Sequence, residues 1–216
     1  MIDIYLIRHG QTGGNLAKRH QLEETHITPE GKDQARKVGA FVKTLNLTRM
    51  IASSHVRTLE TAGFITEGTD CIPESNPIFM ELIRPDAIYG YRHKSSRSMW
   101  YLMKWYFGFA GDDGSVKEGE SYQAFRQRIE DAQNLLTQSP DGARVAVVSH
   151  SVFISFLVAH MCDTTPVSFF QARKLFKNML KLRNGSVTHV QYDKNAAEGV
   201  CPWQLVAYNQ HAHLDT

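Results

Sequence analysis

Two histidines in this sequence each follow directly on a run of apolar residues. Only Arg8 separates His9 from the run Ile2–Ile7. Only Ser149 separates His150 from the run Val145–Val148. Continuous apolar runs of this length are typical of parallel strands that are buried on both faces. Ligands of open α/β sheets bind beyond the carboxyl ends of such strands. The sequence therefore predicts that both imidazoles lie in one crevice at the same edge of a sheet.

Three charged side chains are predicted at this same edge. Arg8 ends the first strand, and Arg57 opens a helix after a short strand at Met50–Ala52. Glu81 follows a third predicted strand, Ile78–Met80. Guanidinium groups match phosphate oxygens bidentately, and glycine-rich loops and helix N-termini can add backbone N–H donors. Together with the two histidines, these residues predict a site for a phosphate dianion.

The residues around both histidines resemble the histidine phosphatase superfamily, the phosphoglycerate mutase-like family. Arg8-His9-Gly10 at the end of an N-terminal strand is the signature of that family. The resemblance covers nearly the whole chain outside 87–117. Its other blocks, in chain order, are Gln11-Thr12 with Asn15, then Thr28, Gly31, Gln34 and Ala35, then Ser53, Arg57, Thr61 and Ala62, then Glu81, and finally Val147–His150.

The resemblance implies a role for each site residue. His9 is the nucleophile and forms a phosphohistidine. Glu81 protonates the leaving oxygen and then activates the water that hydrolyses the intermediate. Four side chains bind the phosphoryl oxygens: Arg8, Asn15, Arg57 and His150.

Elementary chemistry agrees with these roles. Imidazole attacks phosphorus only through an unprotonated nitrogen, and two arginines with a cationic second histidine offset the charge of the transition state. An alcohol leaves poorly as alkoxide, so an acid is needed; Glu118 and Glu120 are alternatives to Glu81 for that role. No metal-ligand spacing is present, so we expect neither a metal nor another cofactor.

The segments that face the substrate favour a phosphatase over a mutase. Mutases of the family carry a glycine-rich segment with asparagine after the second histidine, where this chain has Ser151-Val152-Phe153. They also carry an arginine pair, and no Arg-Arg occurs here. We expect a metal-independent phosphatase acting on a phosphorylated small molecule, with a phosphoprotein possible. The alternatives are a phosphoglycerate mutase-type phosphoryl transferase and a non-catalytic phosphate-recognition module.

Strand and helix signals alternate along the chain. Thr28-Pro29-Glu30 begins a helix, because threonine caps and proline suits the first helical position. Further helices are predicted at Val56–Glu67, at the apolar spacing from Tyr122 to Leu136, and from about Val152. Alternation of this kind predicts an α/β fold, a three-layer α/β/α sandwich with a mostly parallel mixed sheet.

The antiparallel part of the sheet is predicted near the C-terminus. Asn184-Gly185 lies between Met179–Arg183 and Val187–Tyr192, and Asn-Gly between alternating runs is a strong hairpin signal. Leu205–Ala207 is a candidate last strand. We expect one domain over 1–216.

One segment of that domain is expected to be an insertion, at about 87–117. Ala87–Gly111 contains no acid, four basic residues and eight aromatic residues. Trp100, Met103 and Phe107 are spaced 3 and 4, and Tyr101 and Trp105 are four apart, as in a helix. This helix either packs on the core or forms a cap over the phosphate pocket, with Arg97 and Trp100 as the candidate cap residues. Five basic residues are candidates for a second anionic group: Arg84, Arg92, Lys94, Arg97 and Lys104.

Composition and charge argue against nucleic-acid-binding and membrane proteins. The 216 residues carry a net charge of +2, so no basic field argues for nucleic acid or for a membrane surface. Val145–Cys162 is 18 residues without a formal charge, but its serines and histidines indicate a buried strand and helix rather than a membrane span. Cys71, Cys162 and Cys201 form no CxxC pair, which favours reduced thiols and a cytoplasmic protein.

Overall fold

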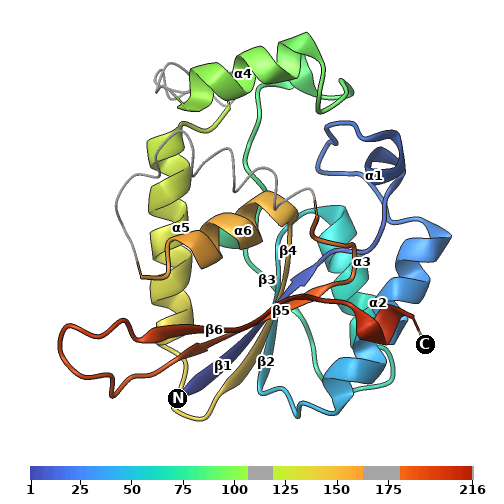
Figure 1. The fold of residues 1–216 in the computed structure, drawn as a ribbon. Helices are drawn as coiled ribbons and strands as arrows, with labels where there is room; N and C mark the ends of the chain where they lie inside the picture. Colours follow the sequence, from blue (N-terminus) through green and yellow to red (C-terminus); the bar gives the residue numbers. More distant parts are fainter. Residues whose placement is uncertain (107–118, 163–180, 216) are drawn as a thin grey trace.

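The fold is built on a mixed sheet, seen in a computed structural model that describes residues 1–106, 119–162 and 181–215 (Figure 1). Six strands are present in the described residues, in the order β3-β2-β4-β1-β5-β6. Their bounds are β1 Ile2–Arg8, β2 Arg49–Ala52, β3 Glu74–Ser75, β4 Arg144–Ser149, β5 Val187–Tyr192 and β6 Trp203–Gln210.

The two strands that precede the histidines are neighbours at the centre of the sheet. β1 and β4 are parallel, and Arg8 of β1 lies opposite Ser149 of β4. β2 and β3 continue the parallel part, whereas β5 runs antiparallel to β1 and β6 antiparallel to β5. Because the carboxyl ends of β1 and β4 meet, His9 and His150 leave the sheet side by side, as predicted.

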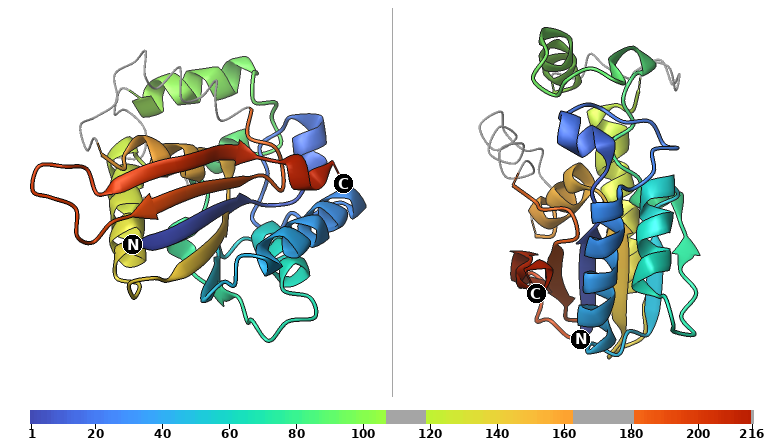
Figure 2. Two further views of the ribbon diagram at one scale, coloured as in Figure 1. Left: turned by 60° about the horizontal axis from the view of Figure 1, so that its bottom comes forward. Right: turned by 90° about the vertical axis from the view of Figure 1, so that its right-hand side faces the viewer.

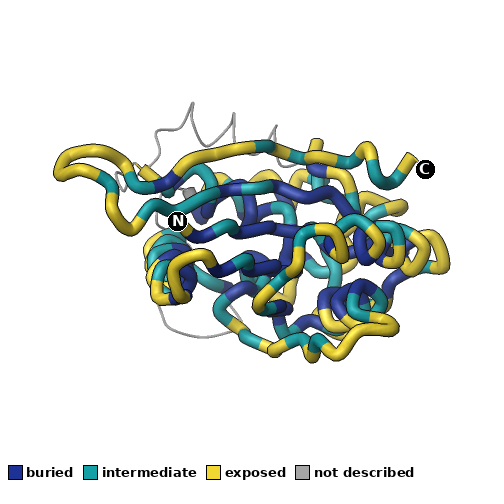
Figure 3. Tube along the Cα trace, turned by 90° about the horizontal axis from the view of Figure 1, so that it is seen from below, coloured by how far each residue is buried: buried dark blue, intermediate teal, exposed yellow. Residues whose placement is uncertain are grey.

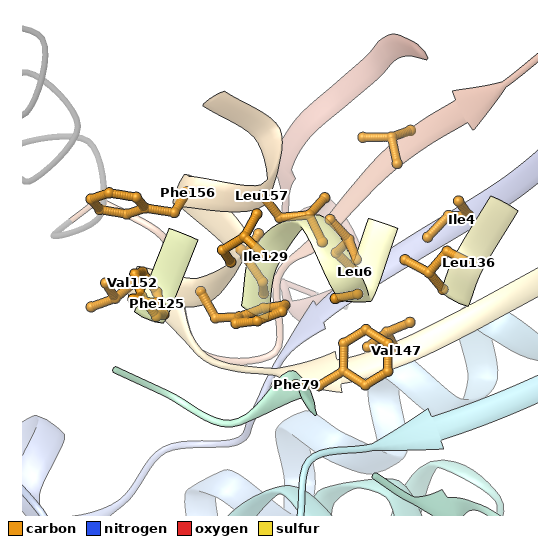
Figure 4. Packing of buried hydrophobic residues seen from close by; sticks show 14 of the residues in the cluster. Ile4, Leu6, Phe79, Phe125, Ile129, Leu136, Val147, Val152, Phe156 and Leu157 are labelled. Carbon is orange, nitrogen blue, oxygen red and sulfur yellow. The ribbon is translucent and has the colours of Figure 1, made fainter. Parts of the chain in front are cut away.

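Helices cover both faces of the sheet. On one face, α2 (Pro29–Lys43) and α3 (Val56–Ile65) pack on Tyr5 and Ile7 of β1 (Figure 2). On the other, α5 (Tyr122–Thr137) and α6 (Ser151–Ala159) bury the opposite side of β1, including Leu6 (Figure 4). Both faces of β1 are therefore buried, which explains its continuous apolar sequence. Figure 3 shows the buried residues concentrated in the central strands and the edge strand β6 largely exposed.

The predicted start of α2 is confirmed. The side chain of Thr28 accepts a hydrogen bond from the backbone N–H of Gly31, and Pro29 occupies the first helical turn. The helices α3, α5 and α6 and the strands β2, β4 and β6 also lie where the sequence predicts them, with ends that differ by a few residues.

Two strand predictions are wrong. Ile78–Met80 is not a strand, because Pro77–Phe79 forms the 3-10 helix η1 and Asn76 caps it through the N–H of Ile78. The edge strand next to β2 is instead the short β3, Glu74–Ser75. Residues 181–183 form no strand before the Asn184-Gly185 turn, and 179–180 lie outside the described residues. The hairpin joins β5 to β6 instead, since β5 already has β1 as its other neighbour.

The predicted insertion contains η2 (Asp86–Ile88) and α4 (Ser96–Tyr106); its later part, 107–117, lies outside the described residues. α4 stands apart from the sheet, on the side of α1 (Gly13–Ala17) (Figures 1 and 2). Backbone bonds join the two regions: His20 N–H donates to Tyr91 O and His93 N–H to Lys18 O, at 3.0 and 2.9 Å.

Of the two apolar spacings in α4, the one formed by Tyr101 and Trp105 packs inward. Trp100 and Met103 are 56% and 47% exposed, whereas Tyr101 and Trp105 are 6% and 0% exposed. Trp105 also donates its indole N–H to the carbonyl of Glu120. Apolar side chains of α4 lie on several of its faces, so their spacing alone does not show which face packs on the rest of the protein.

The cysteine prediction is also corrected. Cys162, just after α6, and Cys201, just before β6, form a disulfide with a Cα–Cα distance of 5.5 Å, and Cys71 is free. The argument from reduced thiols therefore no longer supports a cytoplasmic location. Within the described part of the chain, the structure contains no helix with the length and hydropathy of a membrane span.

Candidate active site

His9 lies in the first position after β1, and its backbone N–H donates to the carbonyl of Ser149 on β4. Its Nδ1 lies 2.8 Å from the carbonyl oxygen of Gly10. Because a carbonyl only accepts, Nδ1 carries the proton and Nε2 has a free lone pair. Burial, followed by the charges of Arg57 and Arg8, holds the pKa of His9 well below its ordinary value. The imidazole is therefore neutral and nucleophilic at Nε2.

Gly10 lets the loop after His9 pass close to α2. A Cβ atom on Gly10 would lie 2.4 Å from the carbonyl oxygen of Gly31, a distance that no side chain allows. The N–H of Gly10 donates to the Thr61 hydroxyl at 3.0 Å. This contact fixes the loop against α3, the helix that carries the second arginine.

The two arginines predicted to bind phosphate have unused donors. Arg8 bonds the carbonyl of Leu182, and Arg57 bonds the carbonyl of Leu22, yet the buried Nε of each has no hydrogen-bond partner in the described part of the chain. Burial lowers the pKa of each guanidinium to about 10, so both stay charged at neutral pH. Buried N–H groups are normally paired, so these donors indicate a missing anionic ligand.

His150 is the residue at which α6 begins, and its ring lies next to that of His9. Its ring centroid is 5.2 Å from that of His9, and its Nε2 lies 2.9 Å from the Ser53 hydroxyl. Its buried Nδ1 has no hydrogen-bond partner among the described residues. Burial, and then the charge of Arg57, holds the pKa of His150 well below its ordinary value. His150 is therefore neutral, not cationic.

Glu81 is held by the first turn of α6. Its carboxylate accepts the backbone N–H groups of Leu82, Val152 and Phe153 at 3.0–3.2 Å. The residue is 8% exposed, and its charge raises the pKa of Arg8 against the larger effect of burial. A helix N-terminus that receives a carboxylate in this way is a favourable electrostatic arrangement.

The alternative acids are placed differently. Both carboxylate oxygens of Glu120 accept from the guanidinium of Arg128, at 2.8 and 2.7 Å. Arg128 also donates to the carbonyls of Ile78 and Met80, so this pair ties α5 to the segment before Glu81. Glu118 lies outside the described residues.

Asn15 is the third residue of α1 and stabilises its start. Its side-chain oxygen accepts from the backbone N–H and the hydroxyl of Thr12, at 3.1 and 2.8 Å. The same oxygen accepts from the side-chain amide of Asn184 at 3.1 Å. With the oxygen committed, the amide NH2 of Asn15 is the group that can reach an anion.

Two residues of this site were missed in the sequence. His55, which was not assigned to the site from the sequence, is 6% exposed; its Nδ1 accepts from Nη2 of Arg57 at 2.7 Å, and its ring packs edge-on against His150. Asn184 donates to the carbonyl of His9 at 2.9 Å. The spacing of two residues between His55 and Arg57 was an available signal for the first; no local signal indicated the second.

The predicted cap residues Arg97 and Trp100 are not brought to the site. Both are exposed, and the guanidinium of Arg97 bonds the hydroxyl of Tyr91 at 2.7 Å and lies over its ring. The inner face of α4 instead presents Ser98, whose buried hydroxyl lies 3.0 Å from Nε2 of His20.

Taken together, the unpaired atoms describe an anion site. Among the buried side-chain nitrogen and oxygen atoms that lack a partner in the described residues, four belong to residues that contact His9 or act on its charge: Arg8, His55, Arg57 and His150. The described residues include no cluster of three or more His, Cys, Asp or Glu side chains placed to hold a metal ion. The site can therefore bind a phosphate through guanidinium and imidazole donors and present an imidazole nitrogen to its phosphorus.

Comparison with known families agrees with this chemistry. The family described as histidine phosphatase superfamily (branch 1) matches residues 4–204. The chain belongs to the histidine phosphatase superfamily. The family resemblance drawn from the sequence is thus confirmed, and its members are phosphatases and mutases.

Individual relatives span the same length. The chain is 28% identical to a protein named probable phosphoglycerate mutase GpmB of Enterobacter sp. (strain 638), covering 100% of this chain and 96% of that protein. Among solved structures, Bacillus stearothermophilus YhfR has a TM-score of 0.76 at 22% identity, covering 99% and 100% of the two chains. A phosphoserine phosphatase variant from Entamoeba histolytica, in complex with phosphoserine, has a TM-score of 0.77 at 20% identity, covering 99% and 100%. The likeness to these two solved structures shows that this chain has the same fold as they do.

Proposed function

We propose that this protein is a metal-independent phosphatase that hydrolyses phosphate monoesters through a phosphohistidine on His9. The observation that supports this most is the state of His9: a neutral imidazole with a free Nε2, buried within electrostatic range of the charged Arg8 and Arg57. A general phosphate-binding site has no need of an uncharged nitrogen between two guanidinium groups, whereas a nucleophile does.

The first half-reaction transfers the phosphoryl group to the enzyme. Nε2 of His9 donates its lone pair to phosphorus as the bond from phosphorus to the ester oxygen breaks. The leaving oxygen takes a proton from the carboxyl group of Glu81, so an alcohol departs. Arg8, Arg57 and His150 donate hydrogen bonds to the phosphoryl oxygens, which spread charge in the transition state.

The second half-reaction returns the enzyme to its starting state. The Glu81 carboxylate takes a proton from a water molecule, and the water oxygen attacks phosphorus as the bond to Nε2 of His9 breaks. Inorganic phosphate leaves, and Glu81 is again protonated. Nδ1 of His9 keeps its proton throughout, because it donates a hydrogen bond to the carbonyl of Gly10, 2.8 Å away.

A phosphoglycerate mutase-type phosphoryl transferase is the second candidate, because relatives at 28–29% identity are named probable phosphoglycerate mutases. In that reaction an alcohol takes the phosphoryl group from His9 in place of water. A phosphorylated small molecule is the proposed substrate in either case, and we retain a cytoplasmic location as part of the proposal.

The deciding experiment follows the phosphoryl group. Enzyme quenched during turnover of a 32P-labelled alkyl phosphate should carry acid-labile, base-stable phosphate on Nε2 of His9, and His9→Ala should carry none. His26→Ala is the matched control, since the side chain of His26 is 72% exposed and bonds Glu60. Label recovered as inorganic phosphate supports the phosphatase, and label recovered on an added alcohol supports the transferase. Binding of the ester without label on His9 would leave only a phosphate-recognition module.

A further inference from the structure

The segment 182–186, just before β5, holds the end of β1 and the start of the loop of His9. The N–H of Gly185 donates to the carbonyl of Arg8, and the N–H of Arg8 donates to the carbonyl of Ser186, each at 3.0 Å. The carbonyl of Leu182 accepts from the guanidinium of Arg8. These bonds extend the antiparallel pairing of β5 with β1 to the last residue of β1. The segment 182–186 is therefore fixed beside His9.

The side-chain amide of Asn184, in this segment, contacts three oxygen atoms of the site. Its Nδ2 lies 2.9 Å from the carbonyl oxygen of His9, 3.1 Å from Oδ1 of Asn15 and 3.4 Å from the carbonyl oxygen of Gly10. A reversed amide would place its oxygen against the two carbonyl oxygens, so the NH2 group is the one that faces the loop. Two N–H bonds already serve three acceptors, and the amide therefore acts through the groups that it holds.

One of these acceptors also holds the imidazole of the nucleophile. The carbonyl of Gly10 accepts the proton on Nδ1 of His9 at 2.8 Å, which leaves Nε2 free to attack phosphorus. Asn184 holds this carbonyl and the carbonyl of His9, the two that flank the Cα atom of Gly10. Glycine has the widest backbone freedom of any residue, so these bonds limit the direction of the Gly10 carbonyl. The direction of that carbonyl in turn sets the direction of Nε2.

The third acceptor belongs to the side chain that is proposed to reach the phosphate. Oδ1 of Asn15 accepts from Asn184 and from the N–H of Thr12, at 3.1 Å each, so the NH2 group of Asn15 is the one that can reach an anion. Hydrogen bonds in a chain polarise one another, so an amide whose oxygen accepts is a stronger donor. A phosphate bound by Asn15 would therefore be the end of a chain that begins at Asn184.

The turn itself gives no reason for an asparagine at this position. The N–H of Ser186 donates to the carbonyl of Arg183, so Asn184 and Gly185 are the two central residues of the turn. The positive φ, 73°, falls on Gly185, and Asn184 is not among the non-glycine residues with positive φ in the described part of the chain. A residue with negative φ at the first central position need not be asparagine. The side-chain contacts are therefore what the asparagine adds.

We propose that Asn184 is a positioning residue of the active site, which directs His9 through the carbonyl of Gly10 and orients the amide of Asn15 toward the phosphate. The inference rests on the proposed phosphatase function and adds to it a residue that lies 175 positions after the nucleophile. One side chain thus links the group that attacks phosphorus to a group that binds the phosphoryl oxygens. Its loss should slow phosphoryl transfer and weaken substrate binding together.

The first test removes the amide and keeps the turn. Asn184→Ala has no donor, and alanine adopts the negative φ of this position without strain. Rapid quench with a 32P-labelled alkyl phosphate measures the burst of His9 phosphorylation, and steady-state rates give KM. Loss of one or two neutral hydrogen bonds should slow the burst and raise KM by about 3–10-fold each. Asn184→Ser, which keeps a shorter donor, should give smaller effects and repeats the comparison if the alanine variant does not fold.

A double-mutant cycle separates the two routes. In an Asn15→Ala background there is no amide to orient, so Asn184→Ala should no longer change KM. The burst should still slow by the same factor, because the carbonyl of Gly10 is released in that background too. A KM effect of the same size in both backgrounds would overturn the route through Asn15. A burst rate that does not respond to Asn184→Ala would overturn the route through His9.

Asn184→Asp distinguishes a positioning role from a role in the turn alone. Aspartate suits a turn before glycine as well as asparagine does, so a residue that only formed the turn would tolerate aspartate better than alanine. A positioning role predicts the reverse order. A carboxylate donates no hydrogen bond and places its charge against the oxygens that Nδ2 contacts, so the burst should slow by about 10–100-fold. Asn195→Asp adds the same charge to the exposed loop after the other end of β5 and should leave the burst rate and KM unchanged.

The outcomes separate the two proposals. Wild-type enzyme without label on His9 would overturn the phosphatase function, whatever the variants do. Label on wild-type His9, with the same burst rate and KM in Asn184→Ala, would overturn only the positioning role. An Asn184→Asp variant that is faster than Asn184→Ala would overturn that role as well. The melting temperature of each variant identifies any that is not folded.

Discussion

The carboxylate of Glu81 accepts the backbone N–H of Phe153, 3.2 Å away, in the first turn of the helix that His150 caps. The proposed proton donor and the second histidine are therefore positioned by one structural unit, the start of α6. Movement of that helix would displace both groups, so their relative geometry is preserved as substrates bind.

The leaving group should decide how much Glu81→Gln matters. Glutamine keeps a side-chain oxygen for the N–H groups of α6 but has no proton to give. The alcohol of an alkyl phosphate needs that proton to leave, whereas nitrophenolate leaves without it. The pre-steady-state burst, in which the leaving group is released as His9 is phosphorylated, should therefore slow by about 10²–10⁴-fold for the alkyl ester and much less for the nitrophenyl ester.

Rapid-quench measurement of both bursts, in wild type and Glu81→Gln, gives the comparison. Steady-state rates should fall for both esters, because water attack on the phosphohistidine still needs a base. Equal slowing of the two bursts would show that Glu81 only positions the phosphate. Unchanged bursts would transfer the acid role to another residue.

Asn15→Asp separates helix capping from phosphate binding. An aspartate oxygen can still accept from the N–H of Thr12, so α1 should form, but the amide NH2 is replaced by a negative charge. We expect KM for an alkyl phosphate to rise by about 10–100-fold while the melting temperature changes little. A melting temperature that falls with KM unchanged would mean that Asn15 is purely a helix cap.

His55 should act on the phosphate through Arg57. In His55→Asn the amide oxygen can replace Nδ1 as the acceptor for Nη2 of Arg57, whereas His55→Leu leaves that donor unpaired. KM should rise about tenfold in His55→Leu and far less in His55→Asn, with kcat less affected. Exposed His26→Leu is the control. Identical effects of the leucine and asparagine substitutions would contradict a positioning role.

The buried histidines should make folding stability depend on pH. Burial is the largest cause of the lowered pKa values of His9, His20, His55 and His150, and His20 and His55 fall to about 3. The unfolded chain binds their protons near pH 6.5, while the folded chain excludes them. Stability is therefore full above about pH 6.5 and falls as the pH drops toward the folded-state values.

Urea unfolding between pH 7.5 and 5 measures this effect, since most surface carboxylates titrate below that range. The midpoint should decrease toward pH 5, and vanadate should reduce the decrease by favouring protonated His150. His55→Asn should flatten the slope and exposed His26→Ala should not. A midpoint that is constant over this range would show that these imidazoles are protonated in the folded protein.

The sequence predicted the centre of the site because strong local signals placed it. Almost continuous apolar runs identified β1 and β4, and parallel pairing of the two strands brought His9 to His150. Glu81 was predicted from a strand that does not exist. Its carboxylate is held by the N-terminus of α6, a contact between residues 71 and 72 apart in the chain.

Other features could not be predicted because they depend on contacts distant in the chain. Asn184 looked like a turn residue, and its contact with the loop of His9 exists only when β5 pairs with β1. The inner face of α4 is selected by Trp105 reaching the carbonyl of Glu120. The disulfide joins residues 39 apart, a spacing that carries no motif.

The hydrogen bond from Asn184 to the carbonyl of His9 spans 175 residues. During synthesis, His9 leaves the ribosome 175 residues before Asn184 does. The loop of His9 therefore lacks this contact until Asn184 has been made. We expect a product cut off before Asn184 to have an unsupported His9 loop, even where its first strands have folded.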